Sequence, residues 1–440
     1  MLVADCDCER PGGPRPSSYS LRERYEVTDG DYEVDEVEAD EDVSEFPPDV
    51  QVLDERDDEF EEDAPIADEF LRYFGADFDV DGLVRRLKNR DITVPTFDPR
   101  PEDQTEYAGF QRKLVWTKKQ KDRFIESILL GYPVPGIFLV ERSGRKYLVL
   151  DGQQRLRTLQ EYKAGAYGEP GKERVFRLTY VGPHFHGQRY DDLTPANQRV
   201  LDNTFIQATV VVPKSPDARS SVYQLFERIN SGGTNLQPQE IRVALYAGPR
   251  IDAIRLLNYE PAWRALFGRP HTRLKDNELI LRYMALRPVA EGLSENGWNR
   301  DVLRSAARAS GGDVRAYTSP MSGFLNAYLD AYASVDGASS PESRAFSLTC
   351  QALVAANPEV LHLDGSTQVN AAHTDALLVG LSLAPSISER GVMPDISSVR
   401  EAVEELLADG SYQSAVREST SHANSVYSRL ELSTKAFESL

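Results

Sequence analysis

Hydrophobic residues recur at helical or strand spacing along most of the chain after residue 65. Residues 78–92, "FDVDGLVRRLKNRDI", place Val80, Leu83 and Leu87 on one side of a helix. The runs "GIFLVE" and "RKYLVL", residues 136–141 and 145–150, predict two strands joined as a hairpin. Further strands are predicted at 92–97, 173–181 and 205–213, and further helices at 153–165, 194–203, 215–230 and 238–248. The first half therefore predicts a mixed α/β domain.

A helix is also predicted immediately after Thr117. Gln120 follows Thr117 by three residues, which is the spacing of a capping box. The apolar residues of this helix lie on one side, and its other face carries Lys118, Lys119, Lys121 and Arg123. That basic face is either a solvated helix surface or a surface that attracts nucleic acid.

From about residue 250 onward the spacing is almost entirely helical, as in "DNELILRYMALR" and "SSVREAVEELLADG". We therefore expect an α+β fold class with three segments: an acidic, disordered tail at residues 1–64, a mixed domain at 65–250 and an all-helical domain at 251–440.

The charge distribution changes how the net charge of −20 is interpreted. Residues 1–64 contain 24 acidic residues and five arginines, so they account for −19 and leave −1 for the rest of the chain. A near-neutral body can keep local basic patches for phosphates. The tail is then either a solubilising leader or an arm that mimics DNA and competes for a basic groove.

The three cysteines, Cys6, Cys8 and Cys350, match neither a disulfide framework nor a zinc site. The sequence also contains no run long enough to span a membrane and no secretion signal, so a cytoplasmic location without membrane contact is expected.

The segment "LDGQQR", residues 150–155, concentrates hydrogen-bonding groups where a strand passes into a helix. Gly152 permits a tight turn, and the first amide groups of the helix point outward with a partial positive charge. Gln153 and Gln154 can donate and accept hydrogen bonds, and Arg155 can hold a phosphate. Asp151 either binds Mg²⁺ or fixes Arg155. The segment predicts an anion site.

Two further motifs contain candidate residues for binding the same anionic ligand. "FQRKLVW", residues 110–116, contains a second candidate phosphate ligand, Arg112, and ends on Trp116, which is typical of a core anchor. "FERINSGGTNLQPQEIR", residues 226–242, places Asn230 before a glycine-rich loop that allows a ligand close to the backbone.

These three motifs, in this order, resemble the N-terminal domain of GmrSD-type restriction endonucleases. The resemblance covers about residues 75–250, and it implies a fold similar to the ParB/sulfiredoxin nucleotide-binding domains. It implies a nucleoside triphosphate with Mg²⁺, bound at Arg112, Gly152, Gln153, Arg155 and Asn230, in a DNA restriction or phage-defence system. For hydrolysis, Asp151 or Gln154 would orient the water, Arg155 would neutralise phosphate charge, and Asp151 would be the metal ligand.

One departure from many relatives concerns the nuclease. The histidines of the C-terminal half are scattered, and no cysteine or acidic cluster accompanies His184 and His186, so a fused HNH nuclease is not expected. The resemblance leaves three functions open: a nucleoside triphosphatase that regulates or senses, a DNA-binding module without hydrolysis that works with a separate nuclease subunit, or a scaffold that docks a nuclease or self-associates.

Overall fold

The structure is a computed structural model. It describes residues 50–53, 71–94, 116–142, 144–168, 173–213, 219–229, 237–299, 316–335, 337, 340–363 and 366–440, without the side chains of 219, 220, 226 and 227. Among the described helices, none combines the length and the apolar character that a membrane crossing requires.

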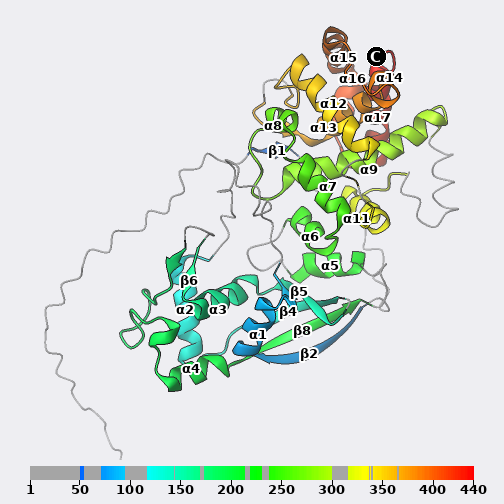
Figure 1. The fold of residues 1–440 in the computed structure, drawn as a ribbon. Helices are drawn as coiled ribbons and strands as arrows, with labels where there is room; N and C mark the ends of the chain where they lie inside the picture. The colour runs from blue at the N-terminus through cyan, green and yellow to red at the C-terminus, as the bar shows by residue number, and fades with distance from the viewer. Residues whose placement is uncertain are drawn as a thin grey trace, which may run out of the picture. The chain divides into compact units, whose positions relative to one another are not determined.

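A five-stranded mixed sheet organises the first part of the chain (Figure 1). Its order is β2-β8-β4-β5-β3. The strands are β2 (Leu71–Asp79), β3 (Ile92–Thr93), β4 (Ile137–Arg142), β5 (Lys146–Asp151) and β8 (Phe205–Pro213). The pairs β2–β8 and β4–β5 are antiparallel, whereas β4–β8 and β3–β5 are parallel. A separate antiparallel pair is formed by β6 (Ala166–Tyr167) and β7 (Arg174–Val175).

Helices cover both faces of the sheet. They are α1 (Val80–Lys88), α2 (Lys118–Leu129), α3 (Gln153–Ala164), α4 (Pro195–Asp202), α5 (Arg219–Ile229) and α6 (Pro238–Leu245), with a 3-10 turn η1 (Tyr190–Asp192). Leu139 and Val149 pack with α1, α2 and α3 on one face, whereas the next residues, Val140 and Leu150, pack with α5 and α6 on the other. Successive residues of these strands point to opposite faces of the sheet, so each strand contributes side chains to two separate hydrophobic cores.

The capping box predicted for the second helix is confirmed. The Thr117 hydroxyl accepts from the backbone N–H of Gln120 at 3.3 Å, and the Gln120 side chain accepts from the backbone N–H of Thr117 at 2.9 Å. Two orphan amide groups at the start of α2 are thereby satisfied.

Among its described residues, the second part of the chain contains helices and one short strand. Its helices are α7 (Pro249–Leu257), α8 (Pro261–Phe267), α9 (Lys275–Glu295), α11 (Met321–Tyr332), α12 (Pro341–Ala356), α13 (Ala371–Ser382), α14 (Pro385–Ser388), α15 (Ile396–Ala408), α16 (Gly410–Arg417) and α17 (Ala423–Phe437). They share one hydrophobic cluster that runs from Val243 to Phe437. The expected α+β class, with a mixed part followed by a helical part, is confirmed.

Two predictions about strands need correction. Residues 1–64 were expected to be disordered, but β1 (Val52–Leu53) pairs in parallel with β9 (Val369–Asn370), and Val50 and Val52 pack on the helical core. The strand expected at 173–181 reaches only Val175. The backbone N–H groups of Thr179 and Tyr180 donate to the Asp122 carboxylate of α2 instead of to a strand.

Candidate functional site

The turn from β5 to α3 adopts the conformation that its glycine allows. Gly152 has φ of 94°, in the left-handed region, and caps the start of α3. A Cβ at this position would lie 2.4 Å from Cγ2 of Ile137 and 3.3 Å from Nη2 of Arg155. Both backbone conformation and space therefore require glycine here.

The start of α3 has no side-chain cap. The first helical bond runs from the N–H of Leu156 to the carbonyl of Gly152 at 3.0 Å. The earlier amide groups, those of Gln153, Gln154 and Arg155, have no hydrogen bond to any described residue. A helix start with unsatisfied N–H groups and the positive end of the helix dipole favours an anion.

Arg155 points back against the sheet. Its Nη2 donates to Oδ2 of Asp151 at 2.7 Å and to the carbonyl of Gly136 at 2.9 Å. The Arg155 side chain is 14% exposed and that of Asp151 is 43% exposed. Of the two roles considered for Asp151, the structure shows the carboxylate bonded to the arginine.

Gly136 and Ile137, which were not predicted as site residues, shape this turn. A Cβ on Gly136 would lie 2.7 Å from the carbonyl oxygen of Gln207, so glycine allows β4 to approach β8 closely. The carbonyl of Gly136 then receives Arg155. The only sequence signal is the glycine before the strand "IFLVE", and it does not indicate which side chain will use that carbonyl.

The two glutamines have different environments. Gln153 is 8% exposed, and its Nε2 has no hydrogen-bond partner among the described residues. Oε1 of Gln154 accepts from the backbone N–H of Trp116 at 3.2 Å, and Trp116 stacks edge-on against Phe124 of α2. Gln154 therefore connects the turn to the residue that precedes α2, and Trp116 is the core anchor that its sequence position indicated.

The structure brings together Asp151, Gly152, Gln153, Gln154 and Arg155, which are contiguous in sequence. The other two predicted ligands, Arg112 and Asn230, lie outside the described residues. Their proximity to the turn remains a prediction.

The described residues do not form a magnesium site by themselves. They contain no group of three or more His, Cys, Asp or Glu side chains placed to hold a metal ion. Mg²⁺ needs near-octahedral oxygen coordination, commonly from one or two carboxylates, phosphates and water. Here Asp151 is the single carboxylate at the turn motif, and its Oδ2 is bonded to Arg155.

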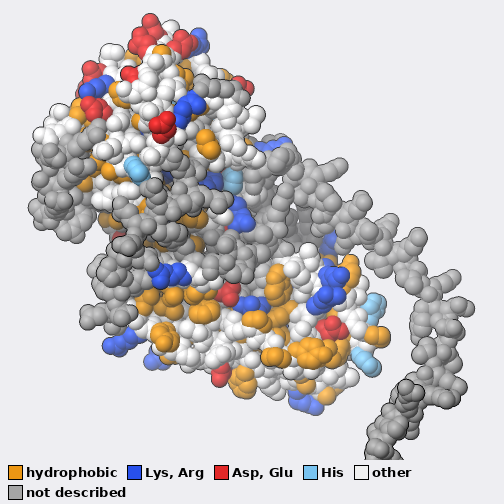
Figure 2. Space-filling view, turned by 180° about the vertical axis from the view of Figure 1, so that it is seen from behind, with side chains coloured by type: hydrophobic (Ala, Val, Ile, Leu, Met, Phe, Trp, Pro, Cys, Tyr) orange, Lys and Arg blue, Asp and Glu red, His pale blue; other side chains and the backbone are white. Residues whose placement is uncertain are grey.

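The basic face expected on α2 is not continuous. Lys121 is 4% exposed and pairs with Glu161 at 2.6 Å, and Lys118 pairs with the buried Asp122. Both ammonium groups also lie over the ring of Tyr167. Only Lys119 and Arg123 of the four are exposed. On the face drawn in Figure 2, Lys and Arg side chains are scattered among hydrophobic and acidic ones.

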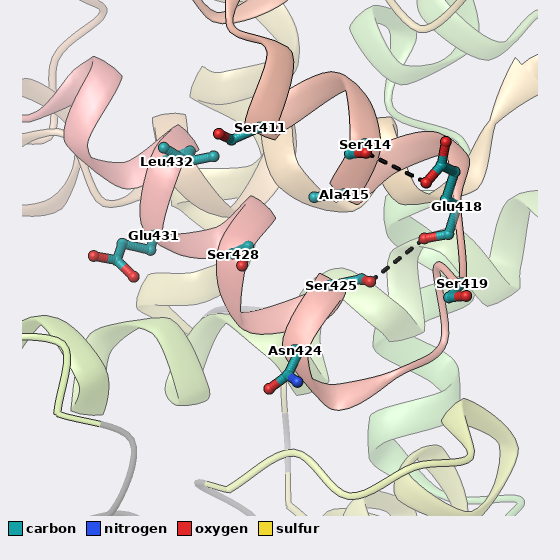
Figure 3. Close-up of a pocket in the computed structure, with 10 residues that line it drawn as sticks. All are labelled: Ser411, Ser414, Ala415, Glu418, Ser419, Asn424, Ser425, Ser428, Glu431 and Leu432. Atoms are coloured by element: carbon teal, nitrogen blue, oxygen red, sulfur yellow. Dashed lines mark hydrogen bonds between the residues drawn. The ribbon is translucent and has the colours of Figure 1, made fainter.

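A cavity of about 460 Å³ lies far along the chain, between α16, α17 and their connection (Figure 3). Hydroxyl groups of Ser411, Ser414, Ser425 and Ser428 line it together with Glu418. None of the described ligand candidates, residues 151–155, contributes to it. Its lining indicates no particular ligand.

Comparison with known proteins identifies the first part of the chain. Residues 100–247 match the family model described as the GmrSD restriction endonuclease, N-terminal domain. The chain therefore contains a domain of this family, which associates it with DNA restriction and phage defence. No curated protein matches the chain.

Proposed function

We propose that the α+β part binds a nucleoside triphosphate at the β5–α3 turn and acts as a regulatory or sensor component of a restriction system. The observation that carries the proposal is the start of α3. There, backbone amide groups without described partners lie beside the Arg155 guanidinium, which is held in place by hydrogen bonds to Gly136 and Asp151. Such a site holds phosphate oxygens without rearranging, which is how proteins position phosphoryl groups.

Each part of the turn has a role in this proposal. Gly152 sets the direction of α3, the backbone N–H groups of Gln153, Gln154 and Arg155 donate to the phosphate oxygens, and the Arg155 side chain supplies the positive charge. Gln154 couples the ligand to Trp116, and hence to α2, through the bond between its Oε1 and the Trp116 amide. Hydrolysis, with Gln154 orienting water, would be the enzymatic part of the function.

Calorimetric titration of the full chain with ATP, GTP, CTP and UTP tests this function, in Mg²⁺ and in EDTA. Arg155→Ala should weaken binding about 10- to 100-fold, because a charged hydrogen bond contributes about 1.5–3 kcal/mol. Arg123→Ala removes the same charge from an exposed position on α2 and should leave binding unchanged. Phosphate release measured on the same variants tests hydrolysis. Absence of nucleotide binding, or equal binding by the Arg155→Ala variant, refutes the proposal.

The alternative, a DNA-binding module without hydrolysis, uses the same turn for DNA phosphates. Because Lys118 and Lys121 are occupied by internal carboxylates, α2 offers such a module less charge than its sequence suggested. Salt-sensitive DNA binding that is lost in Arg155→Ala, without any nucleotide binding, would favour this alternative.

A further inference from the structure

The carboxylate of Asp151 lies next to the proposed anion site, because it is hydrogen-bonded to Arg155 in the first turn of α3. Asp151 ends β5 and immediately precedes Gly152, the cap of α3. A carboxylate near a helix start is stabilised by the same dipole that attracts a phosphate. The site in its ligand-free form therefore already contains one negative charge.

The hydrogen bonds of Arg155 show how the negative charge of Asp151 affects the arginine. Both of its hydrogen bonds to described residues use Nη2, one to Asp151 and one to Gly136, so Nη1 makes none to these residues. The Arg155 side chain is 14% exposed and is hydrogen-bonded through Nη2, while its partner carboxylate is 43% exposed. Asp151 thus directs the arginine and also neutralises part of its charge.

We propose that Asp151 is a positioning residue for Arg155 that also competes electrostatically with the bound anion, and that it is not a metal ligand. This inference rests on the proposed anion site. It follows from the hydrogen bond that Oδ2 of Asp151 accepts from Arg155, and from the partly exposed position of the carboxylate beside the start of α3. Replacing the carboxylate by an amide keeps an acceptor for Arg155 and removes the competing charge.

The probes are tripolyphosphate and the tightest-binding nucleotide, titrated into wild type, Asp151→Asn and Asp151→Ala, in EDTA and in Mg²⁺. Asp151→Asn should bind both probes about threefold to tenfold more tightly in EDTA, because one nearby, partly exposed negative charge is gone. Asp151→Ala should bind more weakly than Asp151→Asn, since it no longer directs the guanidinium. The increase caused by Mg²⁺ should be the same in wild type and Asp151→Asn.

Asp81→Asn is the matched control. Asp81 is 56% exposed and pairs with Lys163 at the other end of α3, so the variant removes the same charge about 15 Å from the turn. It should leave affinity unchanged.

A metal-ligand role would appear as a loss of Mg²⁺-dependent affinity in Asp151→Asn, and it would overturn the inference. A purely structural role would appear as a lower unfolding temperature in both Asp151 variants, with unchanged affinity, and would also overturn it. If wild type binds neither probe, the proposed function and this inference fail together; if wild type binds and Asp151→Asn does not bind more tightly, only the inference fails.

Discussion

Replacing Gly152 by alanine tests the packing of the turn. Two effects add: a non-glycine residue at φ of 94° costs about 1–2 kcal/mol, and a Cβ 2.4 Å from Cγ2 of Ile137 overpacks the core at about 1–3 kcal/mol. We therefore expect the free energy of unfolding to fall by about 2–5 kcal/mol, as measured by denaturant titration.

Gly165 provides the control at the opposite end of the same helix. It has φ of 75°, and a Cβ there would meet nothing within 4 Å. Gly165→Ala should therefore show only the backbone cost of about 1–2 kcal/mol. The difference between the two variants isolates the contact with Ile137.

A double-mutant cycle identifies the atom responsible. Ile137→Ala removes Cγ2 and should relieve part of the Gly152→Ala cost, giving a coupling of about 1–2 kcal/mol. Ile137→Val keeps the Cγ2 methyl and should give no such relief. Equal costs for Gly152→Ala and Gly165→Ala, or no coupling to Ile137→Ala, would refute the description of the turn.

Three further predictions concern the rest of the fold. Lys121→Met should destabilise the protein by about 1–3 kcal/mol, because it removes the charged hydrogen bond to Glu161, whose side chain is 24% exposed. Lys119→Met on the exposed side should change the unfolding free energy by less than about 0.5 kcal/mol. Val52→Asp should lower stability by about 2 kcal/mol, since Val52 packs on the helical core; Leu53→Asp is the control, because Leu53 is 56% exposed. Burial lowers the pKa of His373 to about 4, so below about pH 6.5 the unfolded chain binds a proton that the folded chain does not. Stability should therefore fall by about 3 kcal/mol between pH 6.5 and 4, and a His373→Gln variant that keeps the same slope would contradict this.

Local sequence rules predicted the parts of the fold that depend on local patterns. The alternation in β4, β5 and β8 and the helical spacing of α1, α2 and α3 follow directly from side-chain burial. β2 was missed because Arg72, Gly75 and Asp77 interrupt its apolar pattern, and its pairing with β8 joins residues far apart in sequence. Residues 71–79 therefore form a strand because they pair with β8, and not because of their local sequence pattern.

In the site, too, the sequence predicted local features but not the contacts between residues far apart in the chain. The glycine turn and the outward-facing amide groups at the helix start were predicted from neighbouring residues in the sequence, whereas the pairing of Asp151 with Arg155 was one of two alternatives that the sequence left open. The carbonyl of Gly136 and the methyl group of Ile137 come from β4, and their contact with the turn depends on strand pairing. Likewise, the charges of Lys118 and Lys121 could be counted in the sequence, but their pairing with Asp122 and Glu161 could not be predicted from it.

The central claim is that phosphate oxygens bind at the start of α3. The most direct test is a crystal structure of the chain grown with a non-hydrolysable nucleoside triphosphate. The account predicts a phosphate group within hydrogen-bonding distance of the backbone N–H groups of Gln153–Arg155 and of the Arg155 guanidinium. A nucleotide bound elsewhere, with the Gly152 turn filled by the protein's own side chains, would contradict it.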